Sequence, residues 1–331
     1  MPKIYDIGIV PRRTELAERF MFPFSQLNFL LNGGEFDRVT LITSSTDNGK
    51  STIASQILCS VIKQGYKACA FFGEDTAYES QDRIFKQGCK AEDMVYKPYK
   101  ANGKETNCGE WVLTDTAYEN ARNAFQGNLF LYNTNASMKV EDILDGFEQA
   151  RAEHGCKVFL LDNCEMFDID TDNENKAMKD NILQIREYAI NHQVHIFLIS
   201  HIRKLENGKI LPSLDDVKGT SSIVNISKNV LIVVRMDKVD HESKEYKALK
   251  RLIELNNYDL DQADSLVYVA KTKGRKLGFC CLKYNKRTNT YYECKKLDDK
   301  KEESEKSEVI VKRPQLEEIK GFDFADDEIF G

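Results

Sequence analysis

The sequence has no apolar run long enough to cross a membrane. A transmembrane helix needs about 20 consecutive apolar residues, and no stretch of this 331-residue chain approaches that length. The amino-terminal stretch MPKIYDIGIVPRRTE also lacks the apolar centre and small-residue cleavage site of a secretory signal peptide. We therefore expect a cytoplasmic protein without a membrane partner.

The chain also lacks the cysteine spacing of a zinc cluster or a disulfide framework. Its nine cysteines are an odd number, they are scattered, and no two of them form a C-x-x-C pair. Zinc sites and small disulfide-rich folds depend on such spacing. Reduced thiols in the core of a cytosolic protein are the simpler interpretation.

An excess of basic residues, the usual mark of a nucleic-acid-binding protein, is missing too. The formal net charge is −6 at pH 7. However, the segment from Asp298 to the end holds 12 acidic and 6 basic residues, so the rest of the chain is neutral. Overall charge therefore neither indicates nor excludes a nucleic-acid partner.

What the sequence does have is an alternation of short apolar runs with amphipathic segments. Apolar runs alternating with helices predict a parallel sheet covered on both faces, an α/β fold. Three final runs joined by short turns predict an antiparallel addition at the carboxyl end. Residues 89 to 127 are polar and predicted to be irregular, apart from one helix. The predicted strands are 39–43, 67–73, 128–133, 157–163, 195–200, 229–236, 265–273, 278–285 and 290–295, and the predicted helices are 50–64, 77–88, 113–125, 139–154 and 174–192.

The segment SSTDNGKST, residues 44–52, lies between the first predicted strand and the first helix. A phosphate-binding loop has the pattern G-x-x-x-x-G-K-[ST], in which backbone N–H groups surround the phosphates, the lysine reaches the β- and γ-phosphates and the final hydroxyl binds Mg²⁺. Ser44 replaces the first glycine, which is acceptable if that position needs no positive φ. Asp47 fits such an anion site only if its carboxylate points outward. The expected nucleotide-binding residues are Ser44, Ser45, Thr46, Asp47, Asn48, Gly49, Lys50, Ser51 and Thr52.

Three further predicted strands end in polar residues. Asp162 ends VFLLD, Glu74 follows CAFFG, and His201 ends IFLIS. The carboxyl ends of parallel strands meet at one edge of a sheet, where open α/β sheets bind ligands. We expect Asp162 to be a metal ligand beside Ser51, Glu74 to be the water-activating base with Asp75 as its competitor, and His201 to be either a γ-phosphate sensor or a structural histidine.

These segments, in this order, resemble the ATPase domain of the ring-shaped replicative DNA helicases: the DnaB-like bacterial and phage enzymes and mitochondrial Twinkle. The resemblance covers residues 27 to 295 and is carried by GGEFDRVTLITSSTDNGKST, GYKACAFFGED, KVFLLDN, VHIFLISHIRK, SLDDVKGTSSIVNISKNVLIVVRMD, VYVAKTKGRKLG and LKYNKRTNTYYE. It implies a RecA-like P-loop core that uses ATP, or another NTP or dNTP, with Mg²⁺. It also implies a homo-hexameric ring that moves 5′ to 3′ along single-stranded DNA and unwinds forked duplex, in the host cytoplasm if a phage encodes the chain.

The resemblance also implies residue roles beyond the phosphate loop. Arg235 and Tyr284 match a pair that sandwiches the adenine, and Asn225 lies where nucleotide state is coupled to DNA grip. The family's trans-acting arginine finger aligns with Lys273, and Arg275 is the alternative. The segment 203–225 corresponds to DNA-contacting loops, with Lys204, Lys209 and Lys218 as the candidate phosphate contacts.

We expect three regions along the chain. Residues 1–34 would form a lead-in whose helix 12–22 links subunits, 35–297 the ATPase domain, and 298–331 an acidic, disordered tail. The tail's end, 320–331, combines aromatic and acidic residues and would dock on a replication partner such as a primase, polymerase or single-strand-binding protein. Two other functions stay open: a RecA-like DNA-dependent ATPase that is not a helicase, of the recombinase, loader or clock type, and a nucleotide-binding scaffold with little turnover.

Overall fold

The computed structural model describes residues 17–133, 138–168, 174–203, 205, 211–218, 221–239, 241–258, 263–273 and 275–296. Nine strands of this part form the central sheet. They are β3 (Arg38–Ser44), β4 (Lys67–Phe72), β7 (Leu129–Leu131), β8 (Cys156–Asp162), β9 (His195–His201), β10 (Asn229–Arg235), β11 (Ser265–Lys271), β12 (Gly278–Asn285) and β13 (Thr290–Glu293).

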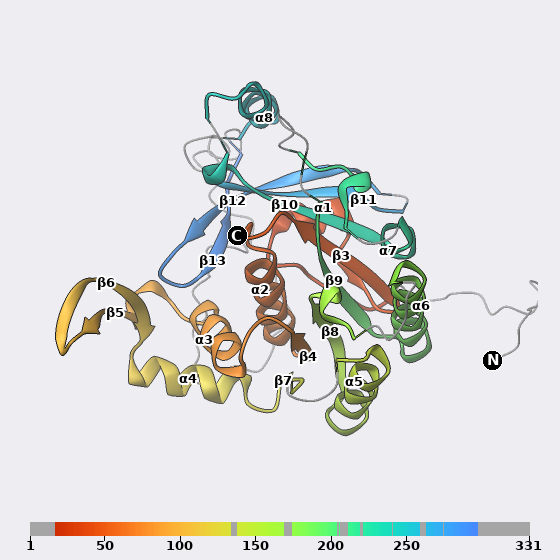
Figure 1. Cartoon of the computed structure of the whole chain (residues 1–331), viewed down its shortest axis with the longest axis horizontal. Helices are drawn as coiled ribbons and strands as arrows, with labels where there is room; N and C mark the ends of the chain where they lie inside the picture. The colour runs from red at the N-terminus through yellow and green to blue at the C-terminus, as the bar shows by residue number, and fades with distance from the viewer. Residues whose placement is uncertain are drawn as a thin grey trace, which may run out of the picture.

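The sheet has the order β13-β12-β11-β10-β3-β9-β8-β4-β7 (Figure 1). Neighbours from β10 through β7 run parallel. From β10 through β13 the pairing is antiparallel. The fold predicted from the sequence, a mostly parallel sheet with antiparallel strands at its carboxyl end, is therefore confirmed.

Helices cover both faces of this sheet and divide the core into two layers. One layer packs α1, α2, α3 and α4 against one face, and the other packs α5, α6, α7 and α8 against the opposite face. Because both faces are covered, the central strands are apolar along nearly their whole length. The helices are α1 (Ser25–Leu31), α2 (Lys50–Lys63), α3 (Ala77–Gln87), α4 (Asp115–Phe125), α5 (Val140–His154), α6 (Glu174–His192), α7 (Ser221–Ile226) and α8 (Lys244–Leu255). Among the described residues, no helix has the length and apolar content to cross a membrane.

The predicted helix 12–22 is wrong over the residues that the structure describes. Within 17–22 the chain is extended, and β1 (Arg19–Phe20) pairs with β2 (Gly34–Glu35). The reason is a period of two: Phe20, Phe22 and Phe24 all point into the core. The helix comes later, at α1, and Glu293 accepts hydrogen bonds from its first backbone N–H groups.

The prediction that 89–127 is irregular apart from one helix is also wrong. Two strands, β5 (Met94–Ala101) and β6 (Lys104–Leu113), form a hairpin that lies apart from the central sheet, beside α3 and α4 (Figure 1). Its turn is Asn102-Gly103, both with positive φ. Asn-Gly is the strongest short signal for a tight hairpin turn, so the sequence held a signal for this element.

Candidate nucleotide-binding site

The polar residues that end the parallel strands meet at one edge of the sheet. Ser44 at the end of β3 pairs in register with His201 at the end of β9, and Phe72 of β4 pairs with Asp162 of β8. Between them lies a cavity of about 310 Å³. Its walls are Thr46, Asp47, Gly49, Lys50, Ser51, Thr52, Glu74, Asp162, Asn163, His201, Arg235, Tyr284 and Tyr291.

The backbone of the phosphate loop explains which positions need glycine. Among the described residues, positive φ in this loop occurs at Asp47 (58°) and Gly49 (83°) and not at Ser44. Ser44 therefore meets the condition set by the sequence analysis, and its hydroxyl donates to the Ser45 carbonyl at 2.6 Å. A Cβ on Gly49 would lie 2.2 Å from the Tyr291 hydroxyl, so glycine is required there by conformation and by space. Asp47 is exposed.

Lys50 lies at the centre of a chain of polar contacts. Its Nζ is 3.2 Å from His201 Nδ1 and 3.4 Å from the Ser45 carbonyl. The other ring nitrogen of His201 is 3.6 Å from a Glu74 oxygen. Burial lowers the pKa of Lys50, while the carboxylates of Asp162, Glu165, Glu74 and Asp47 oppose that shift. The structure thus brings Lys50, His201 and Glu74 together as the sequence predicted.

The contacts of Asn163 fix the tautomer of His201. Asn163 Oδ1 accepts from the Glu165 backbone N–H at 3.0 Å, so its amide nitrogen faces Glu74, to which it donates. That nitrogen is also 3.3 Å from His201 Nε2. Since the Lys50 ammonium can only donate, Nδ1 accepts and Nε2 carries the proton. The Nε2 proton is then directed toward the Glu74 carboxylate.

Glu74, and not Asp75, faces the cavity. Asp75 forms an ion pair of 2.6 Å with Arg83 of α3, and the Arg83 guanidinium lies 4.7 Å from the Phe72 ring centroid. Asp75 therefore fastens α3 to the end of β4, while the Glu74 side chain is 61% exposed beside Asn163. The structure separates two acids that the sequence left in competition.

Asp162 and Ser51 provide oxygen atoms suited to a hard divalent cation. Asp162 is only 7% exposed, and burial raises its pKa to about 6 although a hydrogen bond with the Ser51 hydroxyl lowers it. A buried carboxylate is costly without a nearby positive charge. A cation held by the Ser51 hydroxyl and Asp162 would remove that cost, so the two residues fit Mg²⁺.

Arg235 and Tyr284 stand at the far end of the cavity and already touch. The Arg235 guanidinium carbon is 5.3 Å from the Tyr284 ring centroid. Asn48 of the phosphate loop accepts from the Arg235 backbone N–H at 3.1 Å, which ties the loop to β10. A base held between the two side chains would need them to separate by about 2 Å, since stacked groups lie roughly 3.5 Å apart.

Three residues of the site were not predicted from the sequence. Asn163 and Glu165 follow the Asp162 strand, and Glu165 accepts from the Ser200 hydroxyl and the His201 backbone N–H. Tyr291 is buried, with its backbone held by paired hydrogen bonds to Gln56 of α2. Polar residues directly after a strand that ends in an expected metal ligand were a usable signal for the first two. Tyr291 depends on a contact between segments far apart in the sequence.

The two candidate finger residues do not reach the cavity of their own subunit. Lys273 and Arg275 lie on the exposed connection between β11 and β12, and neither lines the cavity. Lys271 of the same segment turns inward: its ammonium donates to the carbonyls of Val224, Asn225 and Ser227 at 2.5, 3.1 and 2.9 Å. A cation at a helix carboxyl terminus is favourable, so Lys271 fastens this segment to α7.

The residues expected to contact DNA are only partly described. Lys204 and Lys209 lie outside the described residues. Lys218 is exposed, and its backbone N–H donates to the His201 carbonyl at 2.8 Å. Asn225 is exposed on α7. A direct backbone link therefore joins Lys218 to His201.

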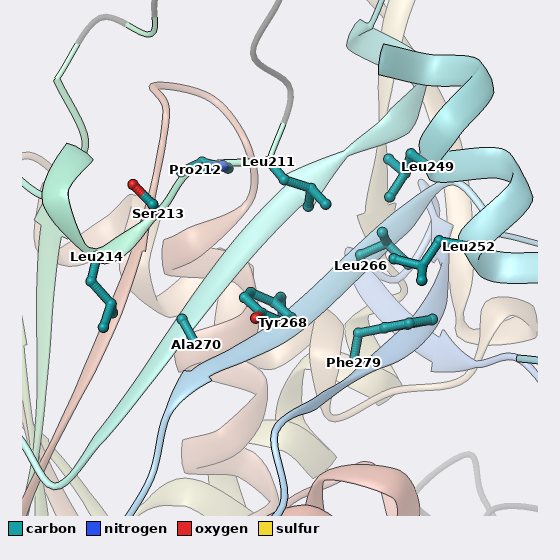
Figure 2. Close-up of a pocket in the computed structure, with 10 residues that line it drawn as sticks. All are labelled: Leu211, Pro212, Ser213, Leu214, Leu249, Leu252, Leu266, Tyr268, Ala270 and Phe279. Carbon is teal, nitrogen blue, oxygen red and sulfur yellow. The ribbon is translucent and has the colours of Figure 1, made fainter. Parts of the chain in front are cut away.

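A second cavity has a different chemistry. It encloses about 350 Å³ between α8, β11, β12 and residues 211–214, and its walls are mostly leucine and aromatic side chains that face one another (Figure 2). Its lining residues carry none of the charged groups that gather at the candidate nucleotide-binding site. We therefore place the nucleotide chemistry at the edge formed by β3, β4, β8 and β9.

Comparison with known proteins gives the family. The model of the DnaB-like helicase C-terminal domain matches residues 21–293. This match spans most of the chain, so the protein belongs to the DnaB-like helicase family of NTP-hydrolysing DNA helicases. No curated protein matches the sequence.

Solved structures show the same fold at low sequence identity. A DnaB-like replicative helicase studied with primase is 14% identical with a TM-score of 0.66, and the match covers 83% of this chain and 63% of that one. An ATPase domain solved on its own is 14% identical with a TM-score of 0.63, covering 81% and 89%. A KaiC-like protein of Pyrococcus horikoshii is 13% identical with a TM-score of 0.53, covering 84% and 99%. This chain thus spans under two thirds of the length of the first helicase.

Proposed function

We propose that the chain is the motor of a replicative DNA helicase, which couples NTP hydrolysis to movement along single-stranded DNA. The observation that supports this most is the meeting of Lys50, Glu74, Asp162 and His201 at one sheet edge. The likeness to the KaiC-like protein is a likeness of fold and does not favour the non-helicase ATPase.

Each residue of the cavity has a role in this proposal. The backbone of residues 44–52 surrounds the phosphates of ATP or another NTP or dNTP, and Lys50 leaves His201 to contact the β- and γ-phosphates. Glu74 accepts the proton of the attacking water. His201, relieved of Lys50, turns its free Nδ1 toward the γ-phosphate. Arg235 and Tyr284 hold the base between them.

Ser51 and Asp162 would hold Mg²⁺. The bound ion supplies charge neutralisation at the β- and γ-phosphate oxygens. The second contribution of positive charge would come from a neighbouring subunit, through Lys273 or Arg275. Both are exposed and away from their own cavity, as a residue that acts on the adjacent subunit requires. This supports a ring, which we propose to be a homo-hexamer.

The DNA strand would run along the segment 203–225. Lys218, together with Lys204 and Lys209, would contact successive phosphates, which gives salt-sensitive binding with little sequence preference. Since Lys218 is bonded through its backbone to His201, a shift of the γ-phosphate sensor would move a DNA contact. Asn225 lies on the helix that Lys271 fastens to the finger segment, which suits a coupling residue.

The acidic end of the chain, 320–331, lies outside the described residues. We propose that it docks on a primase, polymerase or single-strand-binding protein. Deleting 320–331 should leave NTP hydrolysis intact and weaken such a complex; unchanged partner binding would contradict this role.

Unwinding of a forked duplex tests the helicase proposal. The chain, with NTP and Mg²⁺, should separate a fork that has a free 5′ tail on the tracking strand, and should need that polarity. DNA-stimulated hydrolysis without unwinding at any protein concentration would favour the non-helicase ATPase. Nucleotide binding with negligible hydrolysis would favour the scaffold.

A further inference from the structure

The β5–β6 hairpin and the turn between β12 and β13 bring aromatic and basic side chains to one place. The Arg287 guanidinium carbon lies 4.1 Å from the centroid of the Trp111 ring. Tyr96 pairs with Trp111 across the hairpin, with ring centroids 5.5 Å apart in an edge-on arrangement. Two segments far apart in the sequence therefore form one surface.

The alternation of side chains extends this surface along the hairpin. On β5, Tyr96 and Lys100 are four residues apart and so face the same side. Tyr96 is 47% exposed, and Lys100, Lys286 and Arg287 are exposed. We call this set the ribbon surface: Tyr96, Lys100, Trp111, Lys286 and Arg287.

The cations of the ribbon surface are not neutralised by neighbouring acids. No ion pair joins Lys100, Lys286 or Arg287 to a carboxylate among the described residues. One carboxylate, Glu105, stands opposite Lys100 in register. The Arg287 guanidinium instead lies over the indole, a cation–π contact.

We propose that the ribbon surface binds single-stranded nucleic acid, at a place separate from the segment 203–225. Proteins that bind single strands combine uncompensated cations, which follow the phosphates, with aromatic side chains on which bases stack. Tyr96 and Trp111 provide the aromatic rings, and Lys100, Lys286 and Arg287 provide the cations. An acidic protein would match the cations but leave the adjacent aromatic rings without stacking partners.

The ribbon surface also adjoins the candidate nucleotide-binding site. Tyr284, which lines the cavity, donates through its hydroxyl to Asn289 Oδ1 at 2.7 Å. Asn289 belongs to the same turn as Lys286 and Arg287, and its carbonyl accepts from Gln87 of α3 at 2.8 Å. This second strand contact adds to the proposed helicase function and does not depend on the channel lysines.

The chain offers a direct optical test, because Trp111 is its one tryptophan. Titrating the full chain with a thymidine oligonucleotide, without NTP, should quench tryptophan fluorescence in a saturable way. Lys100→Glu combined with Arg287→Ala should weaken this binding about tenfold or more. Glu105→Lys should strengthen it. Lys250→Glu on α8 is the matched control and should leave the titration unchanged.

The outcomes separate this inference from the proposed function. Unchanged Trp111 fluorescence, under conditions where the same oligonucleotide stimulates NTP hydrolysis, would overturn the ribbon surface and leave the helicase proposal standing. Quenching without any stimulation would support the ribbon surface and contradict the helicase. Equal quenching by polyglutamate would identify the surface as a site for acidic proteins and overturn the inference.

Discussion

Lys50 Nζ lies 3.2 Å from Nδ1 of His201, so the phosphate loop and the end of β9 are joined by one polar contact. The lysine and the histidine come from neighbouring parallel strands. A phosphate that takes Lys50 also releases His201. In our account this exchange is how the site reports the presence of the γ-phosphate to Lys218 and the DNA segment that follows.

Glu74 should be essential for hydrolysis and dispensable for nucleotide binding. Glu74→Gln removes the group that accepts the proton of water, and we expect the rate to fall roughly a hundredfold or more. Affinity for a fluorescent NTP analogue should stay within about twofold. Asp75→Asn is the matched control: it breaks the ion pair with Arg83 and should retain hydrolysis. A more active Glu74→Gln than Asp75→Asn would reverse the assignment.

The trans-acting finger should be separable from the residues that act within one subunit. Arg275→Ala should abolish turnover and spare nucleotide binding, since a finger is worth about 10³–10⁵ in rate. Mixing Arg275→Ala with Glu74→Gln subunits should restore hydrolysis, because some interfaces then carry both intact residues. If Lys273→Ala abolishes turnover and Arg275→Ala does not, the finger is the lysine.

Asp162 should destabilise the protein when no cation is bound. Its folded pKa of about 6 lies above its ordinary value of 3.8, so the folded state binds the proton more tightly and loses stability as pH rises through this window. Asp162→Asn removes that cost. We expect it to raise the free energy of unfolding at pH 7.5 by about 2 kcal/mol, measured by urea titration, and to abolish Mg²⁺-dependent hydrolysis. A less stable Asp162→Asn variant would contradict this.

The buried His195 should make the protein sensitive to mild acid. Burial lowers its pKa to about 4 from 6.5, and its Nδ1 donates to the Glu35 carbonyl at 2.7 Å. A histidine buried in its neutral form loses stability as pH falls from 6.5 toward 4. The free energy of unfolding at pH 5 should be about 2 kcal/mol below that at pH 7.5. The drop should shrink in His195→Leu, and an equal drop in that variant would assign the effect elsewhere.

The sequence predicted the parts of the site that depend on chain direction. Glu74, Asp162 and His201 each end an apolar strand, and the geometry of a parallel sheet then brings them to one edge. It could not predict the choice between Glu74 and Asp75, because that depends on Arg83, a residue on the following helix. Lys271 was in a similar position, since its contacts with α7 are made across a turn of the chain.

The errors of prediction have equally specific causes. The predicted helix 12–22 overlooks the alternation of Phe20, Phe22 and Phe24, and a period of two indicates an extended chain. The hairpin β5–β6 was missed because its strands are largely polar, although Asn102-Gly103 was a turn signal. The helix α8 was not predicted either; its apolar positions Leu249 and Ile253 are buried at helical spacing.

The rate of NTP hydrolysis with and without single-stranded DNA, measured at a protein concentration where mass shows the nucleotide-bound oligomer, tests the account most directly. We expect DNA to raise the rate severalfold, and Lys218→Ala to reduce that stimulation while leaving nucleotide affinity unchanged. A rate that is the same with and without DNA, in a chain that binds nucleotide normally, would contradict the central claim that the edge carrying Lys50, Glu74, Asp162 and His201 drives movement on DNA.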